Sequence, residues 1–423
     1  MIFLNINKNY ICTKQVPLLT ISIALCVCLA GCSFITDLFS DDNIQQQSNT
    51  TAPLLDKIPE PDKTSFSYSA ITNTHIKNLY AQIEDECQKT APTEIQCTGE
   101  LTQKDIYEAI IAFKNDHPDV FWLGNKFTYY SNNGYTYVEL TFITTGAELE
   151  KQQQIFSDAV SDFVENATKY SSEYEREKYV NDYIISNCSY DDKAAKNNYQ
   201  SGNAGNTYGV LVEKKAICEG YARTFQLLCN EMGIQCVSVA GMTDNIGHEW
   251  NCAYIEGNWY HIDVTWNDTE NDVDKYAYFN LTDEQMYSSH RVDDLFSKID
   301  ADEYNNDENL IGNLFVPQCT ATEYNYYQQT APTLYGFDDE NDQSITEALA
   351  KAALNKEPYF SIIIDSSLDF DEAYSKLVND AYVVNYIEDA NDLLWGETEL
   401  NTTSYAYKNK NLNVMTIELS YIY

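Results

Sequence analysis

The stretch 216–268 constrains the fold more than any other part of the chain. Apolar residues follow Cys218 at helical spacing, and Gly233 then marks the end of a helix of about four turns. Two strand-like runs come next, separated by the dipeptide Glu256-Gly257. This stretch therefore predicts a buried helix that begins at Cys218 and packs against an antiparallel hairpin.

The length of the hairpin loop decides which side chains share a face. With Glu256-Gly257 as a two-residue loop, Trp250 lies opposite Asp263, and His248 lies on the face of Asp263 within side-chain reach. A loop one residue longer would turn His248 to the other face. We expect the shorter loop, and we expect the helix to pack on this same face, so that Cys218 approaches His248.

A thiol at the start of a helix is a candidate nucleophile, because the helix dipole and a nearby imidazolium both favour the thiolate. The chain has five histidines, and His75 and His117 lie in polar or turn-like segments. The base must then come from His248, His261 or His290. His261 shares the face of Asp263 and is the main rival of His248.

Three short motifs carry a resemblance to a known family. They are Cys-Glu-Gly-Tyr-Ala at 218–222, Gly-His-Glu-Trp-Asn at 247–251 and Trp-Tyr-His-Ile-Asp-Val-Thr-Trp at 259–266. In this order they resemble the transglutaminase-like superfamily, particularly its bacterial extracellular members. The resemblance covers roughly 170–290.

The resemblance implies an α+β fold with a papain-like core, in which a helix carrying Cys218 packs on an antiparallel sheet carrying His248 and Asp263. It implies that Cys218 is the nucleophile, His248 the general base and acid, and Asp263 the residue that orients the imidazole. His261 falls in a motif position that is usually not catalytic. Tyr208, in the short segment before the nucleophile, is a candidate for helping the backbone N–H of Cys218 bind an oxyanion.

Smaller α/β modules are expected to flank this core. We predict an N-terminal module at 67–146, a catalytic domain at 147–300 and a C-terminal module at 301–423. Thr102 to Asp105 reads as a capping box, Asn132-Asn133-Gly134 as a hairpin loop and 382–387 as a strand. Cys87 and Cys97 are the pair expected to form a disulfide.

The first 31 residues contain two lysines, no acidic residue and an apolar run too short to span a membrane. Leu29-Ala30-Gly31-Cys32 then resembles a bacterial lipobox, which predicts a lipoprotein signal peptide at 1–31 and acylation of Cys32. An uncleaved anchor is the alternative. The polar residues 32–66 are predicted to form a disordered tether, so the protein is expected to be membrane-anchored outside the cytoplasm.

The net charge of −39 becomes −41 when residues 1–31 are removed, which argues against nucleic acid as a partner. The charge is spread along the chain and is consistent with the solubility of an exported protein. Beyond residue 32 the chain has no Cys-x-x-Cys and no His-Glu-x-x-His, so we expect no metal and no cofactor.

The leading hypothesis is a cell-surface thiol enzyme that acts on amide bonds of a protein or peptide substrate through an acyl-enzyme on Cys218. Water as the second substrate would make it a peptidase or amidase. A lysine amine would make it a cross-linking transglutaminase. The alternative is a non-catalytic binding or assembly module that keeps the fold.

Overall fold

The structure is a computed structural model that describes residues 12–13, 65–196, 202–244, 246–269, 272–292, 312–396 and 398–422. The predicted lipobox cysteine, Cys32, lies outside the described residues, as do nearly all of the signal peptide and the tether. No helix in the described ranges is both long and apolar enough to span a membrane.

The chain forms two compact units. Of the described residues, those from 65 to 268 and from 289 to 320 belong to the larger unit, and 12–13, 269–288 and those from 321 to 422 belong to the smaller unit. The predicted N-terminal module and most of the predicted catalytic domain therefore lie in one unit, while 269–288 groups with the C-terminal part of the chain. The three-way division at 146 and 300 stays a prediction.

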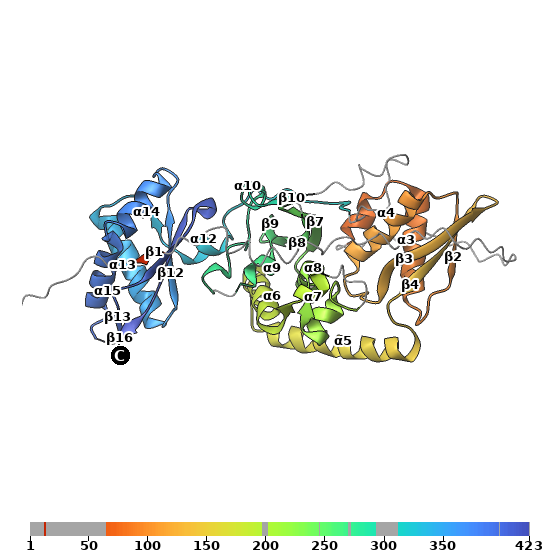
Figure 1. Ribbon diagram of the computed structural model, residues 1–423, viewed down its shortest axis with the longest axis horizontal. Coiled ribbons are helices and arrows are strands. Elements are labelled where there is room, and N and C mark those ends of the chain that lie inside the picture. The colour runs from red at the N-terminus through yellow and green to blue at the C-terminus, as the bar shows by residue number, and fades with distance from the viewer. Residues whose placement is uncertain are drawn as a thin grey trace, which may run out of the picture. The chain divides into compact units, whose positions relative to one another are not determined.

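The N-terminal part of the larger unit combines helices with an antiparallel sheet of order β2-β4-β3 (Figure 1). Its elements are α2 (Phe66–Ala70), α3 (Thr74–Cys87), β2 (Glu94–Thr98), α4 (Gln103–Asp116), β3 (Leu123–Asn132) and β4 (Tyr135–Phe142). The predicted capping box is confirmed, because Thr102 and Asp105 bond each other's backbone N–H at the start of α4. The predicted hairpin loop is confirmed at Asn133-Gly134, where both residues have positive φ.

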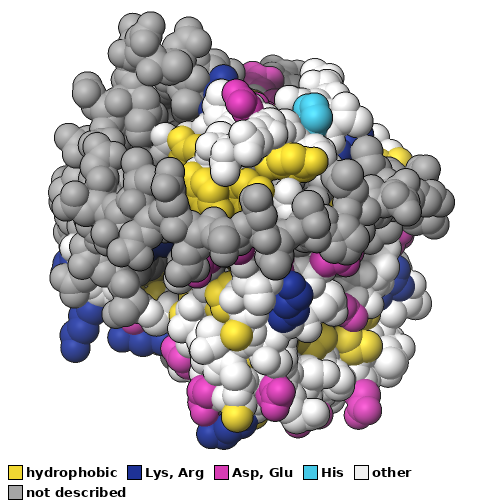
Figure 2. Space-filling view, turned by 90° about the vertical axis from the view of Figure 1, so that its right-hand side faces the viewer, with side chains coloured by type: hydrophobic (Ala, Val, Ile, Leu, Met, Phe, Trp, Pro, Cys, Tyr) yellow, Lys and Arg dark blue, Asp and Glu magenta, His cyan; other side chains and the backbone are white. Residues whose placement is uncertain are grey.

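Charged side chains of both signs are scattered over the surface of this part of the larger unit. Figure 2 shows them on its described surface, with acidic and basic groups interspersed and no large patch of one sign. The distribution agrees with the even spread of charge along the sequence.

The core of the larger unit packs helices against a four-stranded antiparallel sheet of order β10-β7-β8-β9. Its helices and helical turns are α5 (Gly146–Ala167), α6 (Glu173–Asn187), α7 (Asp192–Lys196), the π-helical turn η1 (Gly209–Glu213), α8 (Cys218–Glu231) and α9 (Val264–Asn267). Its strands are β5 (Ser189–Tyr190), β6 (Lys215–Ala216), β7 (Cys236–Thr243), β8 (Ile246–Ile255), β9 (Asn258–Ile262) and β10 (His290–Val292). The predicted α+β fold, with a helix that begins at Cys218, is confirmed.

The smaller unit has its own hydrophobic core around the strand order β1-β14-β15-β12-β11. Its strands are β1 (Cys12–Thr13), β11 (Thr333–Leu334), β12 (Tyr359–Ile364), β13 (Glu399–Leu400), β14 (Tyr405–Asn409), β15 (Val414–Glu418) and β16 (Tyr421–Ile422). Its helices are η2 (Asp272–Asp274), α10 (Asp283–Met286), α12 (Tyr326–Thr330), α13 (Asp339–Leu354), α14 (Phe370–Val378), α15 (Tyr382–Leu393) and η3 (Lys410–Leu412).

The prediction of a strand at 382–387 is wrong, because these residues form the first turns of α15. The β-branched and aromatic residues there suggested a strand. Val383, Tyr386, Ile387 and Ala390 are all buried at spacings of three and four, which is the pattern of one helix face.

The expected Cys87–Cys97 disulfide is also wrong, because the fold places these two cysteines, which are unbridged in the structure, at different ends of α3. The Cys97 sulfur lies 3.6 Å from Asn78 Oδ1, near the beginning of α3. Cys87 ends that helix nine residues later, which corresponds to about 14 Å along its axis. The short loop between the two cysteines therefore spans the helix instead of bringing the sulfurs together.

Candidate active site

The hairpin register brings the predicted site residues to one face of the sheet. Strands β8 and β9 pair with Ile255 opposite Asn258, which confirms the two-residue loop. Both loop residues, Glu256 and Gly257, have positive φ, as a tight hairpin with the right-handed twist of its strands requires. His248 and Asp263 therefore lie on the same face.

Asp263 holds two histidines. Its Oδ2 accepts from His248 Nε2 at 2.6 Å and from His290 Nε2 at 2.9 Å. Its Oδ1 accepts the backbone N–H of Trp266 at 3.1 Å, because Asp263 is also the N-cap of α9. With three fixed partners, the carboxylate of Asp263 is held in one orientation.

Cys218 is hydrogen bonded to His248. It is the first residue of α8 and is 6% exposed, so its sulfur sits at the positive end of a helix of 14 residues. Since Asp263 engages Nε2 of His248, the ring nitrogen left for Cys218 is Nδ1. The structure thus brings together the three residues predicted for catalysis.

The body of α8 lies against the opposite face of the sheet, contrary to expectation. Asn251 Nδ2 donates to the carbonyl of Ala222 at 2.9 Å, and Asn251 points away from the face that carries His248. The first residue of the helix, Cys218, contacts His248. The polar residues Glu249 and Asn251 of β8 therefore contact α8. The side chains that alternate with them, such as His248, lie on the face that carries the site.

The electrostatics of the site favour an imidazolium at His248. Burial alone lowers the pKa of His248, but the charge and hydrogen bond of Asp263, followed by those of Cys218, outweigh it and raise the pKa to about 10. Burial also raises the pKa of Asp263, and the two histidines overcome this and hold it well below its usual range. His248 and Asp263 thus form a buried ion pair at neutral pH.

His290 was not assigned a role from the sequence. It is 2% exposed, and its Nδ1 lies 2.9 Å from the hydroxyl of Ser289. Burial lowers the pKa of His290, and its contact with Asp263 only partly compensates. A neutral His290 therefore donates a hydrogen bond to the Asp263 carboxylate, and His248 remains the histidine that carries the positive charge paired with it.

The rival base, His261, lies elsewhere on the same face. Its Nδ1 accepts from Trp250 Nε1 at 3.1 Å and lies 3.1 Å from the sulfur of Cys252. Tyr208 precedes η1 and packs its ring against Phe121, with the ring centroids 4.9 Å apart. This packing contact does not test an oxyanion role for Tyr208, which stays a prediction.

The family comparison agrees with this geometry. The model of the transglutaminase-like superfamily matches residues 161–264, which include Cys218, His248 and Asp263. Residues 161–264 form a transglutaminase-like domain.

Proteins similar to this chain share only part of its length. Kyphoscoliosis peptidase of Mus musculus is 31% identical over 122 residues, and that of Homo sapiens is 30% identical over 121 residues. Each match covers 26% of this chain and 18% of the relative. The crystal structure of a TGase is 17% identical, with a TM-score of 0.26, and the match covers 45% of this chain and 58% of that one.

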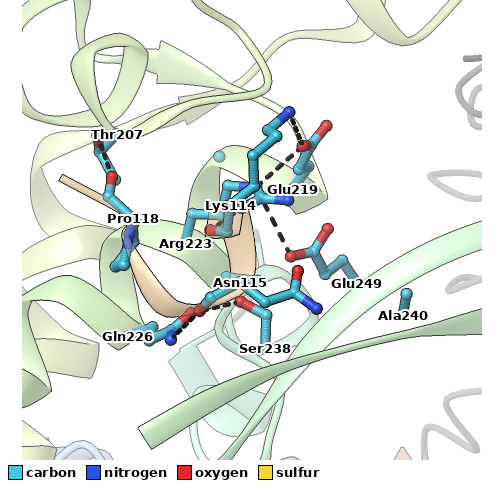
Figure 3. A network of polar contacts seen from close by, with 12 residues as sticks. Lys114, Asn115, Pro118, Thr207, Glu219, Arg223, Gln226, Ser238, Ala240 and Glu249 are labelled. Carbon is cyan, nitrogen blue, oxygen red and sulfur yellow. Dashed lines mark hydrogen bonds and ion pairs between the residues drawn. The ribbon is translucent and has the colours of Figure 1, made fainter. Parts of the chain in front are cut away.

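A buried ionic network connects the transglutaminase-like domain to α4 (Figure 3). Arg223 Nε donates to Glu219 Oε1 at 2.9 Å and lies 3.9 Å from Glu249 Oε1. Lys114 Nζ of α4 lies 3.9 Å from the same oxygen of Glu219. Glu219 directly follows Cys218 in the sequence, and Glu249 directly follows His248. Arg223 therefore contacts the residue next to Cys218 and the residue next to His248.

Helix α4 is also held through its last carbonyl groups, which have no partner within the helix. Arg223 Nη1 donates to the carbonyl of Lys114 at 2.8 Å, and Gln226 Nε2 donates to that of Asn115 at 2.6 Å (Figure 3). Ser238 of β7 fixes Gln226 from the other side, at 2.8 Å. The N-terminal part of this unit therefore supports the helix that carries Cys218, although the family match does not include it.

Two groups of described residues have the atoms to hold a metal ion, with their ligand atoms within 4.8 Å of one another. One group is His248, Asp263 and His290, and the other is Cys252, His261 and Cys319. In the first group, Nε2 of both histidines already binds Asp263. The hydrogen bonds therefore account for the geometry without an ion.

Proposed function

We propose that the protein is a thiol enzyme that cleaves amide bonds of protein or peptide substrates through an acyl-enzyme on Cys218. The observation that carries this proposal is the hydrogen-bonded series of Cys218, His248 and Asp263 at the first residue of a buried helix. The mouse and human relatives are named peptidases, in line with this chemistry.

Before the substrate reacts, the proton of Cys218 already lies on Nδ1 of His248, so the two residues form a thiolate and an imidazolium. Asp263 stabilises this imidazolium, and the imidazolium together with the helix N-terminus favours the thiolate. In the first half of the reaction, the thiolate attacks the carbonyl carbon of the substrate amide. His248 then gives its proton to the leaving amine, and a thioester remains on Cys218.

In the second half, His248 removes a proton from water, and the hydroxide attacks the thioester. The acid product leaves and the Cys218 thiolate is restored. We assign water as the acceptor because a domain surrounded by water would need special shielding to favour an amine. A lysine amine in place of water would give cross-linking by the same residues.

Thiol labelling tests activation without knowledge of the substrate. With limiting iodoacetamide, Cys218 should react faster than any other cysteine of the folded protein, and His248→Gln should remove this advantage. Cys229, in the same helix and 0% exposed, is the internal reference. Slow labelling at both positions would contradict an activated thiol and favour a non-catalytic module.

The acceptor is tested with a labelled protein substrate such as casein. Hydrolysis predicts release of labelled peptides, and cross-linking predicts incorporation of a fluorescent primary amine. Both signals should vanish in Cys218→Ala. Amine incorporation without peptide release would overturn the assignment of water.

We also propose that the protein is a lipoprotein anchored outside the cytoplasm through Cys32. The support is the sequence alone: an apolar run followed by Leu29-Ala30-Gly31-Cys32. Cys32→Ser should release the protein from the membrane fraction or block its maturation. Unchanged membrane fractionation with residues 1–31 retained would show an uncleaved anchor instead.

A further inference from the structure

A second set of reactive groups lies on the same sheet face, away from the hydrogen-bonded series. Cys252 of β8 and His261 of β9 are directly opposite each other in the hairpin. Cys319, from the segment 312–320, reaches the same place. All three side chains are 0% exposed, so this cluster is sealed inside the larger unit.

The two sulfurs are not bonded to each other in this structure, but they lie in van der Waals contact. Cys319 Sγ is 3.8 Å from Cys252 Sγ, and Cys252 Sγ is 3.1 Å from His261 Nδ1. Trp250 donates its indole N–H to the same nitrogen, which shows that Nδ1 of His261 carries a lone pair. His261 is therefore placed to accept the proton of the Cys252 thiol.

We propose that Cys252 and Cys319 form a disulfide in the mature protein. A disulfide has its sulfurs about 2.05 Å apart, so each sulfur needs to move by about 0.9 Å, which a modest side-chain rotation supplies. The pairing rests on the proposed location outside the cytoplasm, where disulfides persist. It does not rest on the reaction proposed for Cys218.

The oxidant is an external disulfide of the thiol–disulfide oxidoreductase class. Cys252 passes its proton to His261, and its thiolate attacks one sulfur of the external disulfide, which releases one thiol. The Cys319 thiol then loses its proton, and its sulfur attacks Cys252 and releases the second thiol. The protons of Cys252 and Cys319 end on the two released thiols. The two cysteines lose two electrons in total, and the external disulfide gains them.

The order of these steps follows from the fold. Cys252 and His261 face each other across a two-residue hairpin, so their contact forms from local sequence alone. Cys319 lies 67 positions from Cys252 along the chain and is placed last. We therefore expect oxidation during folding, before the cluster is sealed.

The bond would fix segment 312–320 to the sheet at a third point. Asn313 already pairs with the backbone of Ala240, accepting its N–H at 2.8 Å and donating to its carbonyl at 2.7 Å. Phe315 packs against Trp259 of β9 with the ring centroids 6.1 Å apart. The bond would add a covalent link four residues from His248 on the same strand.

A metal ion is the competing use of these groups. Closed metal sites of this kind usually have four ligands, and only three groups of the described residues meet here. A disulfide needs no fourth ligand.

Differential alkylation of the full-length protein, exported or refolded with oxidised glutathione, tests the pairing. Free thiols are blocked in denaturant with one alkylating agent, and disulfides are then reduced and labelled with a second agent. Cys252 and Cys319 should carry the second label. In Cys319→Ala, Cys252 should carry the first.

The buried pair Cys229 and Cys236 serves as the reference. These side chains are also hydrogen bonded, but burial raises the pKa of Cys229 and the contact with Cys236 adds to the rise, so this pair should remain reduced. A first label on both Cys252 and Cys319, or a stoichiometric metal lost in Cys319→Ala, would overturn the proposal. Neither readout depends on Cys218 being active.

Thermal unfolding gives an independent measure. Preparation with reductant throughout should lower the unfolding midpoint of the wild type by about 5 to 10 °C, because a bond closing so long a loop restricts the unfolded chain. Cys319→Ala should show no difference between the two preparations. Equal midpoints for reduced and oxidised wild type would count against the bond.

Discussion

The two faces of strand β8 differ in chemistry although their residues alternate along one strand. The even-numbered residues His248, Trp250 and Cys252 face other histidines and cysteines. The odd-numbered residues Glu249 and Asn251 face α8. One face therefore carries the groups that can react. The other face carries the polar groups that hold α8, and with it Cys218, against the sheet.

The faces also handle buried charge differently. On the reactive face, His248 and Asp263 form a close pair at 2.6 Å, with pKa values moved in opposite directions. On the supporting face, Glu249 lies 3.9 Å from Arg223, and burial raises its pKa to about 7 despite that partner. The close pair of His248 and Asp263 keeps both side chains charged at neutral pH. The looser contact between Glu249 and Arg223 leaves a carboxylate that changes its protonation near neutral pH.

The largest effect should come from the nucleophile. Cys218→Ala should reduce turnover by at least about 10⁴-fold, since no other group can carry the acyl intermediate. Cys229→Ala is the matched control, because it makes the same change in a buried thiol of the same helix and should retain turnover. Substantial activity in Cys218→Ala, measured on labelled casein, would refute the proposed role.

Asp263→Asn should reduce kcat by about 10³-fold, because a neutral amide neither stabilises the imidazolium nor fixes its orientation. The pH profile is the sharper measurement. Since activity needs the imidazolium, kcat/KM of the wild type should fall as pH rises through about 10. Without Asp263, burial lowers the pKa of His248, so this alkaline limb should move to lower pH. An unmoved limb would mean that Asp263 does not control His248.

His290→Gln should have a smaller effect, about tenfold on kcat, with KM unchanged. Glutamine can still donate a hydrogen bond but does not reproduce the position of the ring. Because the charge of Asp263 remains, the alkaline limb should stay near pH 10. An unchanged alkaline limb would distinguish His290, which positions Asp263, from Asp263, which sets the pKa of His248. A limb that moved as far as in Asp263→Asn would show that His290 shares the proton.

Much of the site follows from short-range sequence, and its remaining parts do not. The motifs around Cys218, His248 and Asp263, and the two-residue loop, suffice to place His248 beside Asp263. His290 lies 27 positions from Asp263, and no local pattern marks it. Cys319 likewise reaches Cys252 only through the path of the chain. The face of the sheet on which α8 packs depends on which polar side chains of β8 pair with the helix. The alternation of residues along β8 does not show which of the two faces this is.

The smallest change concerns the supporting face and is measured as stability against pH. The folded state raises the pKa of Glu249 from about 4.5 in the unfolded chain to about 7, so between these values the folded protein binds more protons. Wild-type stability should therefore fall as pH rises through that window, and Glu249→Gln should be spared this loss.

From pH 4.5 to pH 8, the free energy of unfolding of Glu249→Gln should gain roughly 1 to 3 kcal/mol relative to wild type, at about 1.4 kcal/mol per pKa unit. Denaturant unfolding at the two pH values measures this difference. Glu150→Gln, at an exposed position of α5, is the control and should show no pH-dependent difference. A relative loss of stability at pH 8 in Glu249→Gln would show instead that the attraction between Glu249 and Arg223 outweighs the burial of the carboxylate. The two faces of β8 would then handle charge in the same way.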